Sequence, residues 1–487
     1  MGDQAEGVLT GDGVKTGTAG AAELKRGVLP LWAVFGVAIG VLAPASTLAL
    51  AIGVVAATAG ALSWLTWALT SVVVLGFAGG IAWLAMRFTS TGGLYGLTSH
   101  AVGSAGAFPV LSFQLISHVV AGPACVLGGA IYAKAFLVRI GVGDGMWILP
   151  LCCALITALI TFMSYREVKV SAKALLAVEL VTVGVIVVLL AVVLFSAPGG
   201  VVDDRQFDFS GNHFALSAVL AAAGFAVFSM AGFEHAATLG REARNPRRAI
   251  ATAVVGSVVF VGVLYVVASY IVVLGFSDLS VLASTTAPLD ALAEANGVGW
   301  LGYVVDLGVS VSFIASSLGI MAGTSRTLYT LSRDGLAPRA LSTIHATQRT
   351  PIVAVAVLGV VYLLVSIAGT LLAEPTTSYG VLGTLVGYLL VAAYGVTTMS
   401  ALIYAVMKRT LGAGIVVFAT LTVLGMAIMY YYSFNPFPRE PYAAVAWIFF
   451  LTVAATLAAY LVLRVRRSPA LDRIGLNDRT SHDEEGV

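Results

Sequence analysis

The sequence predicts an all-α polytopic membrane protein, and two observations support this fold class. Of the 487 residues, 59% are hydrophobic and only 10% are charged, whereas about 25% of the residues of an average soluble domain are charged. Apolar runs of about 20 residues, the length that crosses a bilayer core of roughly 30 Å, recur from Leu31 almost to Leu463. Together these observations predict twelve transmembrane helices.

The expected helices leave only short connections between them. The longest connections on the expected outer side are residues 198–213 and 276–299, and the second carries three acidic residues and no basic residue. In chain order, the helices are expected at residues 31–53, 61–86, 108–137, 147–165, 172–195, 214–239, 251–275, 301–331, 351–372, 381–407, 411–432 and 443–463.

The two ends of the chain are polar. Residues 1–27 are Gly-rich and of mixed charge, without the basic-then-apolar order of a cleaved signal peptide, so we expect a flexible cytoplasmic N-terminal tail. A ten-helix core is expected at 28–410, two accessory transmembrane helices at 411–463 and a cytoplasmic tail at 464–487. The three cysteines all lie in apolar segments and indicate no disulfide framework.

The basic residues predict the orientation of the chain in the membrane. Lys and Arg near the ends of transmembrane helices stay on the cytoplasmic side. With the N-terminus inside, all of the 26 basic residues except Lys134, Arg139, Arg205 and Arg439 fall in cytoplasmic segments. This asymmetry supports an even number of spans in a cell membrane, with both termini in the cytoplasm.

Two of the expected helices contain interruptions. The first carries FGVAIGVLAPAST at residues 35–47, where Pro44 has no N–H and its ring displaces the carbonyl of Gly40. The sixth carries MAGFEH at residues 230–235. One such helix alone is equally well explained by a proline kink packed against a neighbour. Broken helices at matching positions of two five-helix repeats, however, are typical of a central binding site in secondary transporters.

Three further patterns carry a resemblance to a known family. Residues 230–250, MAGFEHAATLGREARNPRRAI, are similar to F-x-G-F-E…E-x-x-N-P-x-R-x-I. RFTSTGGLYGLTSHAVG at 87–103 is similar to R-x-P-x-x-G-G-x-Y-x-Y…G, and the segment at 325–351 is similar to S-R-x-x-Y-x-x-x-R-D-G-x-x-P…T-P. These signatures resemble the amino acid-polyamine-organocation (APC) permeases. The resemblance implies a leucine-transporter-like fold, with a five-plus-five inverted-repeat core followed by two C-terminal helices.

The resemblance also implies a substrate site at the two interruptions. Many members carry I-G-S-G-I in the first helix, where small residues leave backbone N–H groups open to a substrate carboxylate; the corresponding run here, IGVLA, is bulkier and lacks the hydroxyl. Gln114 and His118, one turn apart on the third helix, share a face that either lines the cavity or packs. The expected substrate-binding residues are Ile39, Gly40, Val41, Leu42, Ala43, Gln114, His118, Phe228, Ala231 and Gly232.

Four residues are candidates for coupling or gating. Glu234 either caps the broken sixth helix or carries a proton, because a carboxylate in a membrane segment faces the protein interior or water. Glu179 either carries a proton, helps to hold a cation, or packs as a buried acid. Ser316 and Ser317 correspond to hydroxyl ligands of sodium-dependent relatives, or form interhelical hydrogen bonds. Asp306 is expected to face the outer vestibule or the membrane interface.

The expected function is therefore secondary transport of an amino acid, an amine or a related small organic solute by alternating access, coupled to a proton. Exchange and sodium-coupled symport are the alternatives, and a solute sensor on a transporter scaffold is an alternative of another class. An enzyme is disfavoured because the six histidines are dispersed without ligand spacing. The expected partners are the solute, a proton or sodium ion and the lipid bilayer, with no cofactor, metal or nucleic acid.

Overall fold

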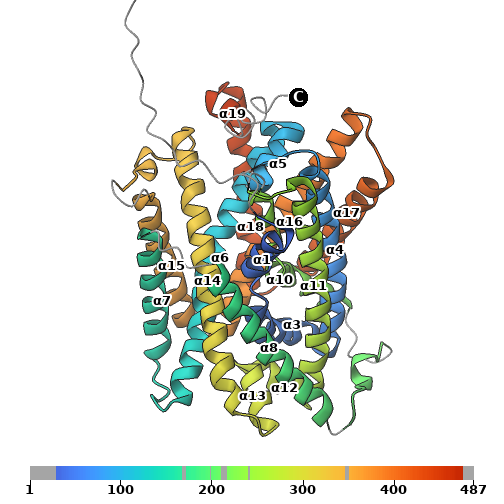
Figure 1. Cartoon of the computed structure of the whole chain (residues 1–487), viewed down its shortest axis with the longest axis vertical. Coiled ribbons are helices and arrows are strands. Elements are labelled where there is room, and N and C mark those ends of the chain that lie inside the picture. The colour runs from blue at the N-terminus through green and yellow to red at the C-terminus, as the bar shows by residue number, and fades with distance from the viewer. Residues whose placement is uncertain are drawn as a thin grey trace, which may run out of the picture.

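The computed structural model describes residues 29–90, 92–166, 172–197, 199–209, 216–239, 242–345 and 350–474. These residues form helices and the loops between them (Figure 1). The expected tail at 1–27, and most of the expected tail at 464–487, lie outside the described residues. The described part of the second tail forms the short helix α19 (Pro469–Arg473).

Eleven segments of the described chain are long and apolar enough to cross a membrane. The first, Leu31–Ala85, is 55 residues long and turns at Gly60, where φ is 65°, so it contains both of the first two expected helices. The principal helices are α1 (Leu31–Leu42), α2 (Pro44–Ser46), α3 (Ile52–Ala59), α4 (Ser63–Ala85), α5 (Gly93–Val102), α6 (Ser104–Arg139), α7 (Ile148–Tyr165), α8 (Ala172–Ser196), α9 (Leu216–Ala221), α10 (Ala223–Ser229), α11 (Pro246–Gly275), α12 (Leu279–Ser284), α13 (Pro288–Ala295), α14 (Trp300–Arg333), α15 (Ile352–Leu371), α16 (Pro375–Met407), α17 (Ala413–Phe434) and α18 (Tyr442–Val465).

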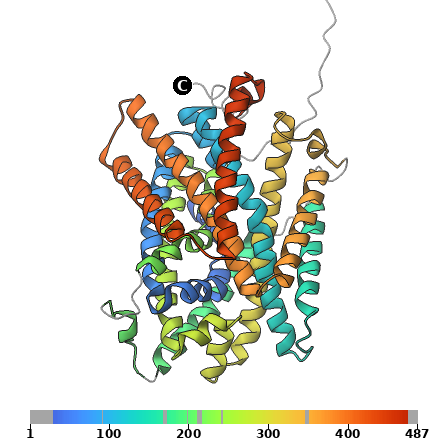
Figure 2. The same cartoon turned by 180° about the vertical axis from the view of Figure 1, so that it is seen from behind.

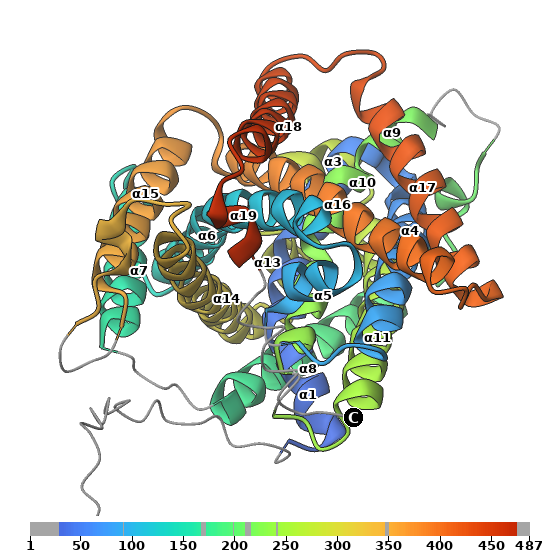
Figure 3. The ribbon, with the colours of Figure 1, turned by 90° about the horizontal axis from the view of Figure 1, so that it is seen from above.

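The helices α1 and α10 appear at mid-height in Figure 1, where α1 packs against α11 and α10 packs against α16. Figure 1 also shows α5 and α19 at one end of the molecule, called here the α5 end, and α12 and α13 at the other, the α13 end. Around the centre, α6 packs against α14 and α16, and α4 packs against α11. Viewed from the α5 end, α7 and α15 form one edge of the molecule, and α17 and α18 lie at its periphery (Figure 3).

The outward surface of the bundle is apolar, as a lipid-facing surface requires. Leu155 of α7, Val188 of α8 and Leu451 of α18 are among the large apolar side chains that are more than half exposed. The helix α17 packs on α4 and α16, and α18 packs on α16 and α6 (Figure 2).

Small residues bring two central helices into backbone contact. A Cβ atom at Gly387 of α16 would overlap the carbonyl oxygen of Gly224 in α10. Such close approach is the usual role of glycine at helix contacts in membranes, because association there depends on packing. The contact fixes α10, and therefore the break that follows it, against α16.

The connection at residues 276–299 differs from the expected open loop. It folds into α12 and α13, and α13 packs against α8 and α14. Asp278 caps α12 by accepting a hydrogen bond from the N–H of Ser280 at 2.8 Å, and Pro288 begins α13. These helices have only six and eight residues. A helical periodicity of apolar residues is recognised over about 11 to 18 residues, so the sequence did not indicate them.

Candidate functional site

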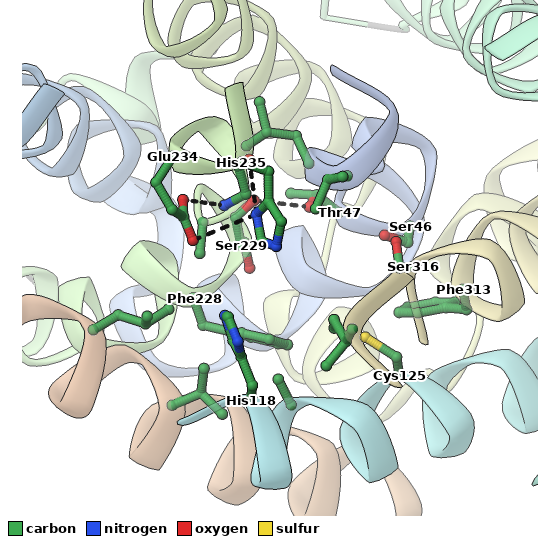
Figure 4. Close-up of a pocket in the computed structure, with 18 of the residues that line it drawn as sticks. Ser46, Thr47, His118, Cys125, Phe228, Ser229, Glu234, His235, Phe313 and Ser316 are labelled. Atoms are coloured by element: carbon green, nitrogen blue, oxygen red, sulfur yellow. Dashed lines mark hydrogen bonds and ion pairs between the residues drawn. The ribbon is translucent and has the colours of Figure 1, made fainter. Parts of the chain in front are cut away.

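The two helix breaks meet near the centre of the molecule and enclose a small pocket (Figure 4). Its volume is about 60 Å³. Six of the ten residues expected to bind substrate line it, namely Val41, Leu42, His118, Phe228, Ala231 and Gly232. Glu234 and Ser316, expected to act in coupling or gating, line it as well.

The first break begins later than the sequence indicated. Helix α1 remains regular from Ile39 to Leu42, and only Ala43 leaves the helical conformation, with φ 45° and ψ 63°. The helix persists because hydrogen bonds of the α-helical type continue as far as the N–H of Ala43, which donates to the carbonyl of Ile39 at 3.1 Å. The ladder then fails at Pro44, which has no N–H.

The carbonyl groups at the end of α1 are left open. The carbonyl of Gly40 would pair with residue 44, which is proline, and the N–H of Ser46 donates to the carbonyl of Ala43 at 3.1 Å. Among the described residues, none donates a hydrogen bond to the carbonyls of Gly40, Val41 or Leu42. The end of α1 therefore presents hydrogen-bond acceptors and the negative end of a helix dipole.

The amide on the far side of this break is capped by a distant carboxylate. The N–H of Ala45 donates to Oε1 of Glu179 at 2.7 Å, and the hydroxyl of Ser312 donates to Oε2 at 2.6 Å. Glu179 is 4% exposed. It therefore joins three elements, α8, α2 and α14, through one buried carboxylate.

The second break has a local cap. Helix α10 ends at Ser229, and the N–H of Gly232 donates to Oε2 of Glu234 at 2.8 Å. Gly232 has a φ of 121°, and a Cβ atom there would lie 2.9 Å from the backbone nitrogen of Leu42. Both the backbone conformation and the close approach to α1 require glycine. Gly40, by contrast, faces open space and does not line the pocket.

An aromatic layer separates the pocket from the α13 end. The rings of Phe228 and Tyr379 lie 6.0 Å apart between centroids, and those of Phe313 and Tyr379 lie 5.8 Å apart. Phe225 extends the layer, 5.8 Å from Phe228. These edge-to-face contacts are favourable, and the layer that includes Phe228 closes the pocket on this side.

On the opposite side the pocket adjoins a wide vestibule. This cavity, of about 400 Å³, extends toward the α5 end and shares His118, Glu234 and His235 with the pocket. Gln114 lines the vestibule and lies outside the pocket. The rings of His118 and His235 stack at 5.7 Å, and Nδ1 of His235 lies 3.2 Å from the carbonyl oxygen of Gly232. His235, to which sequence patterns gave no role, is thus part of the site.

The two serines of α14 occupy different surroundings. The hydroxyl of Ser317 donates to the carbonyl of Gly122 at 3.2 Å, so it forms the interhelical hydrogen bond that was the alternative to a cation ligand. The hydroxyl of Ser316 is buried beside the pocket and has no hydrogen-bond partner among the described residues. Ser312, the partner of Glu179, was missed by the sequence analysis, although its four-residue spacing from Ser316 places both on one face of α14.

Asp306 does not face the outer vestibule or the membrane interface. It is fully buried and accepts a hydrogen bond from Nε of Arg139 at 3.3 Å. Arg139 also pairs with Asp290 at 3.0 Å and with Glu294 at 3.2 Å, and so ties α6 to α13 and α14. Burial raises the pKa of Asp290. This network joins the helices at the α13 end. It also accounts for Arg139, one of the four basic residues outside the expected cytoplasmic segments, because three acidic side chains neutralise its charge.

Lys134 also has a partner at this end, since its Nζ lies 2.6 Å from Oδ1 of Asp144.

Across the described residues, no group of three or more His, Cys, Asp or Glu side chains is arranged to hold a metal ion. The chemistry of the central site is therefore that of carboxylates, carbonyl oxygens, hydroxyl groups, imidazoles and aromatic rings.

Comparison with known proteins identifies relatives of this chain. It is 35% identical over 216 residues to an uncharacterized transporter of Mycobacterium tuberculosis, a match covering 44% of this chain and 48% of the relative. It is 24% identical over 277 residues to a branched-chain amino acid permease of Bacillus subtilis (54% and 58%), and 24% identical over 304 residues to a low-affinity putrescine importer of Escherichia coli (61% and 65%). The matched region thus spans about half the length of the first of these relatives.

The family assignment rests on a longer match. The sequence pattern of the family described as amino acid permease covers residues 29–467, from the start of the described chain to just beyond α18. This range includes both helix breaks, the pocket between them and every residue that lines the vestibule except Ile474. The chain belongs to the amino acid permease family of the APC superfamily.

Proposed function

We propose that this protein is a secondary active transporter that moves a small organic solute, an amino acid or an amine, across the cytoplasmic membrane by alternating access. The observation that carries the proposal is the pocket between the two breaks. It adjoins a vestibule at the α5 end and is separated from the α13 end by the aromatic layer. This one-sided arrangement is what one state of an alternating-access cycle requires. Relatives named as an amino acid permease and a putrescine importer support the same solute classes.

We propose further that the α5 end faces the cytoplasm. Arg244, Arg247 and Arg248 lie beside the start of α11 at this end, and Arg326 and Arg333 lie on the last turns of α14. Basic residues near helix ends favour the cytoplasmic side. The vestibule then opens inward, and both termini are cytoplasmic.

Glu179 is our proposed proton carrier. Its carboxylate accepts hydrogen bonds from Ala45 and Ser312, on two different helices. Protonation would convert two charge-assisted bonds into neutral bonds of roughly half the strength. If these two hydrogen bonds are stronger when the site faces one side of the membrane than when it faces the other, proton binding to Glu179 is coupled to the conformation of the protein.

Uptake into proteoliposomes tests this function. Radiolabelled amino acids and amines are supplied with an imposed pH gradient, with a sodium gradient, or with unlabelled solute inside. The proposal expects accumulation driven by inward proton movement. Accumulation that requires a sodium gradient would identify sodium, and not a proton, as the coupling ion. Uptake that occurs only when unlabelled solute is present inside the liposomes would indicate an exchanger. Binding without any translocation would overturn transport and favour a sensor.

A further inference from the structure

We propose that the central site selects a primary amine that lacks a carboxylate, because a glutamate carboxylate caps an amide at each helix break, whereas carbonyl groups at the end of α1 are left open. This inference rests on the proposed transport function and narrows its solute class. A broken helix exposes N–H groups on one side and carbonyl groups on the other, and these two ends favour opposite charges. Which end is free decides the charge that the site accepts.

A carboxylate occupies one amide at each break. Glu179 takes the N–H of Ala45 at 2.7 Å, and Glu234 takes the N–H of Gly232 at 2.8 Å. A substrate carboxylate would have to displace one of these side chains while lying near its negative charge. Glu179 is 4% exposed and Glu234 is 2% exposed, so water screens neither charge well.

The acceptor side is open. The carbonyls of Gly40, Val41 and Leu42 receive no hydrogen bond from the described residues, and Val41 and Leu42 line the pocket. The buried hydroxyls of Ser229 and Ser316 also line it and have no partner among the described residues. An ammonium group carries three donors and no acceptor, so it matches this set.

The remaining walls also suit an alkylammonium ion. The aromatic rings of Phe228, Phe313 and Tyr379 line the pocket, and ring faces attract cations. Leu390 and Ile320 offer apolar surface to a short carbon chain. The described lining contains no Lys or Arg, and the groups that can carry positive charge are His118 and His235.

Pairs of solutes that differ by one carboxylate test the inference. The full-length protein is reconstituted, and uptake and competition are measured for leucine and isoamylamine, ornithine and putrescine, and lysine and cadaverine. We expect each amine to have an apparent affinity at least about tenfold higher than that of its amino acid. An amino acid that binds as tightly as its amine in any pair overturns the inference but leaves transport intact. No uptake of any of the six solutes overturns the proposed function as well.

Two substitutions at one position identify the source of the selectivity. Glu179→Ala frees the N–H of Ala45, so the preference for amines should fall by about tenfold or more in the pairs that are transported. Glu179→Gln retains a side-chain carbonyl that can accept this hydrogen bond but has no charge, so its preference, measured by competition and counterflow, should lie between those of the wild type and Glu179→Ala. Equal loss of preference in both variants contradicts the capping argument. If Glu179→Ala does not fold, the wild-type solute pairs still decide the inference.

Discussion

The two helix breaks of this permease use the same chemical group in different ways. At the second break, Glu234 caps the N–H of Gly232, two residues away in the same turn. At the first, Glu179 caps the N–H of Ala45, 134 residues away, and also binds Ser312 on α14. A cap within its own turn stabilises a local conformation. A cap from another helix also sets how helices lie relative to one another. Protonation of Glu179 would therefore weaken hydrogen bonds that join α8 to α2 and α14.

The largest expected effect comes from the contact between the two breaks. Gly232→Ala places a Cβ atom 2.9 Å from the backbone nitrogen of Leu42 and forces alanine to a φ of 121°. Such a backbone conformation costs of order 1–3 kcal/mol before any clash. We expect substrate binding to be lost and the melting temperature to fall. Solute binding and thermal unfolding of the purified protein measure both effects.

Gly40→Ala is the matched control for that substitution. It lies one turn from the first break, but an added Cβ atom meets no neighbour within 4 Å. We expect near-wild-type melting and binding. If Gly40→Ala is as damaging as Gly232→Ala, the close approach of the two breaks is not what requires glycine.

The next largest effect is expected at the long-range cap. Glu179→Gln keeps the shape of the side chain but cannot cycle a proton. Accumulation driven by a pH gradient should disappear, whereas counterflow exchange of solute should remain, because exchange needs no net proton movement. Undiminished gradient-driven accumulation in this variant would remove Glu179 as the carrier.

A smaller and different effect is expected at the local cap. Glu234→Gln replaces a hydrogen bond to a charged group by one between neutral groups, a loss of about 1 kcal/mol. Binding and exchange should both weaken by about fivefold, and accumulation should weaken in proportion. Measurement of counterflow and accumulation in the same liposomes separates this pattern from that of Glu179→Gln. A selective loss of accumulation in Glu234→Gln would mean that Glu234, and not Glu179, carries the proton.

The smallest effect is expected at a third carboxylate cap, outside the membrane segments. Although burial opposes its ionisation, hydrogen bonds from Arg205 and Gln206 hold the pKa of Asp203 below its usual value. Ionised Asp203 therefore stabilises the fold above its unfolded pKa, and this contribution is lost as the pH falls through the lower folded pKa. Asp203→Asn should lower the melting temperature slightly at pH 7, and this difference should disappear once the pH falls below the folded pKa of Asp203. An unchanged difference at low pH would contradict this assignment.

The sequence predicted the elements of this structure that depend on local composition. Long apolar runs indicated the membrane segments, and Pro44 and the glycines of the two interruptions indicated the breaks. It could not predict the partners of Glu179 or Asp306, because Ser312 and Arg139 lie more than 130 residues away in sequence and meet them only through helix packing. The first break also begins later than expected, because the apolar helix α1 continues to Leu42, two residues before Pro44.

The central claim is that Glu179 carries the coupling proton, and simultaneous measurement of proton and solute movement tests it most directly. Liposomes containing a pH-sensitive dye receive an inward solute gradient with no imposed pH gradient. We expect internal acidification that accompanies solute entry in the wild type, reduced acidification in proportion to solute entry in Glu234→Gln, and solute entry without acidification in Glu179→Gln. Acidification per solute equal to that of the wild type in Glu179→Gln would contradict the account.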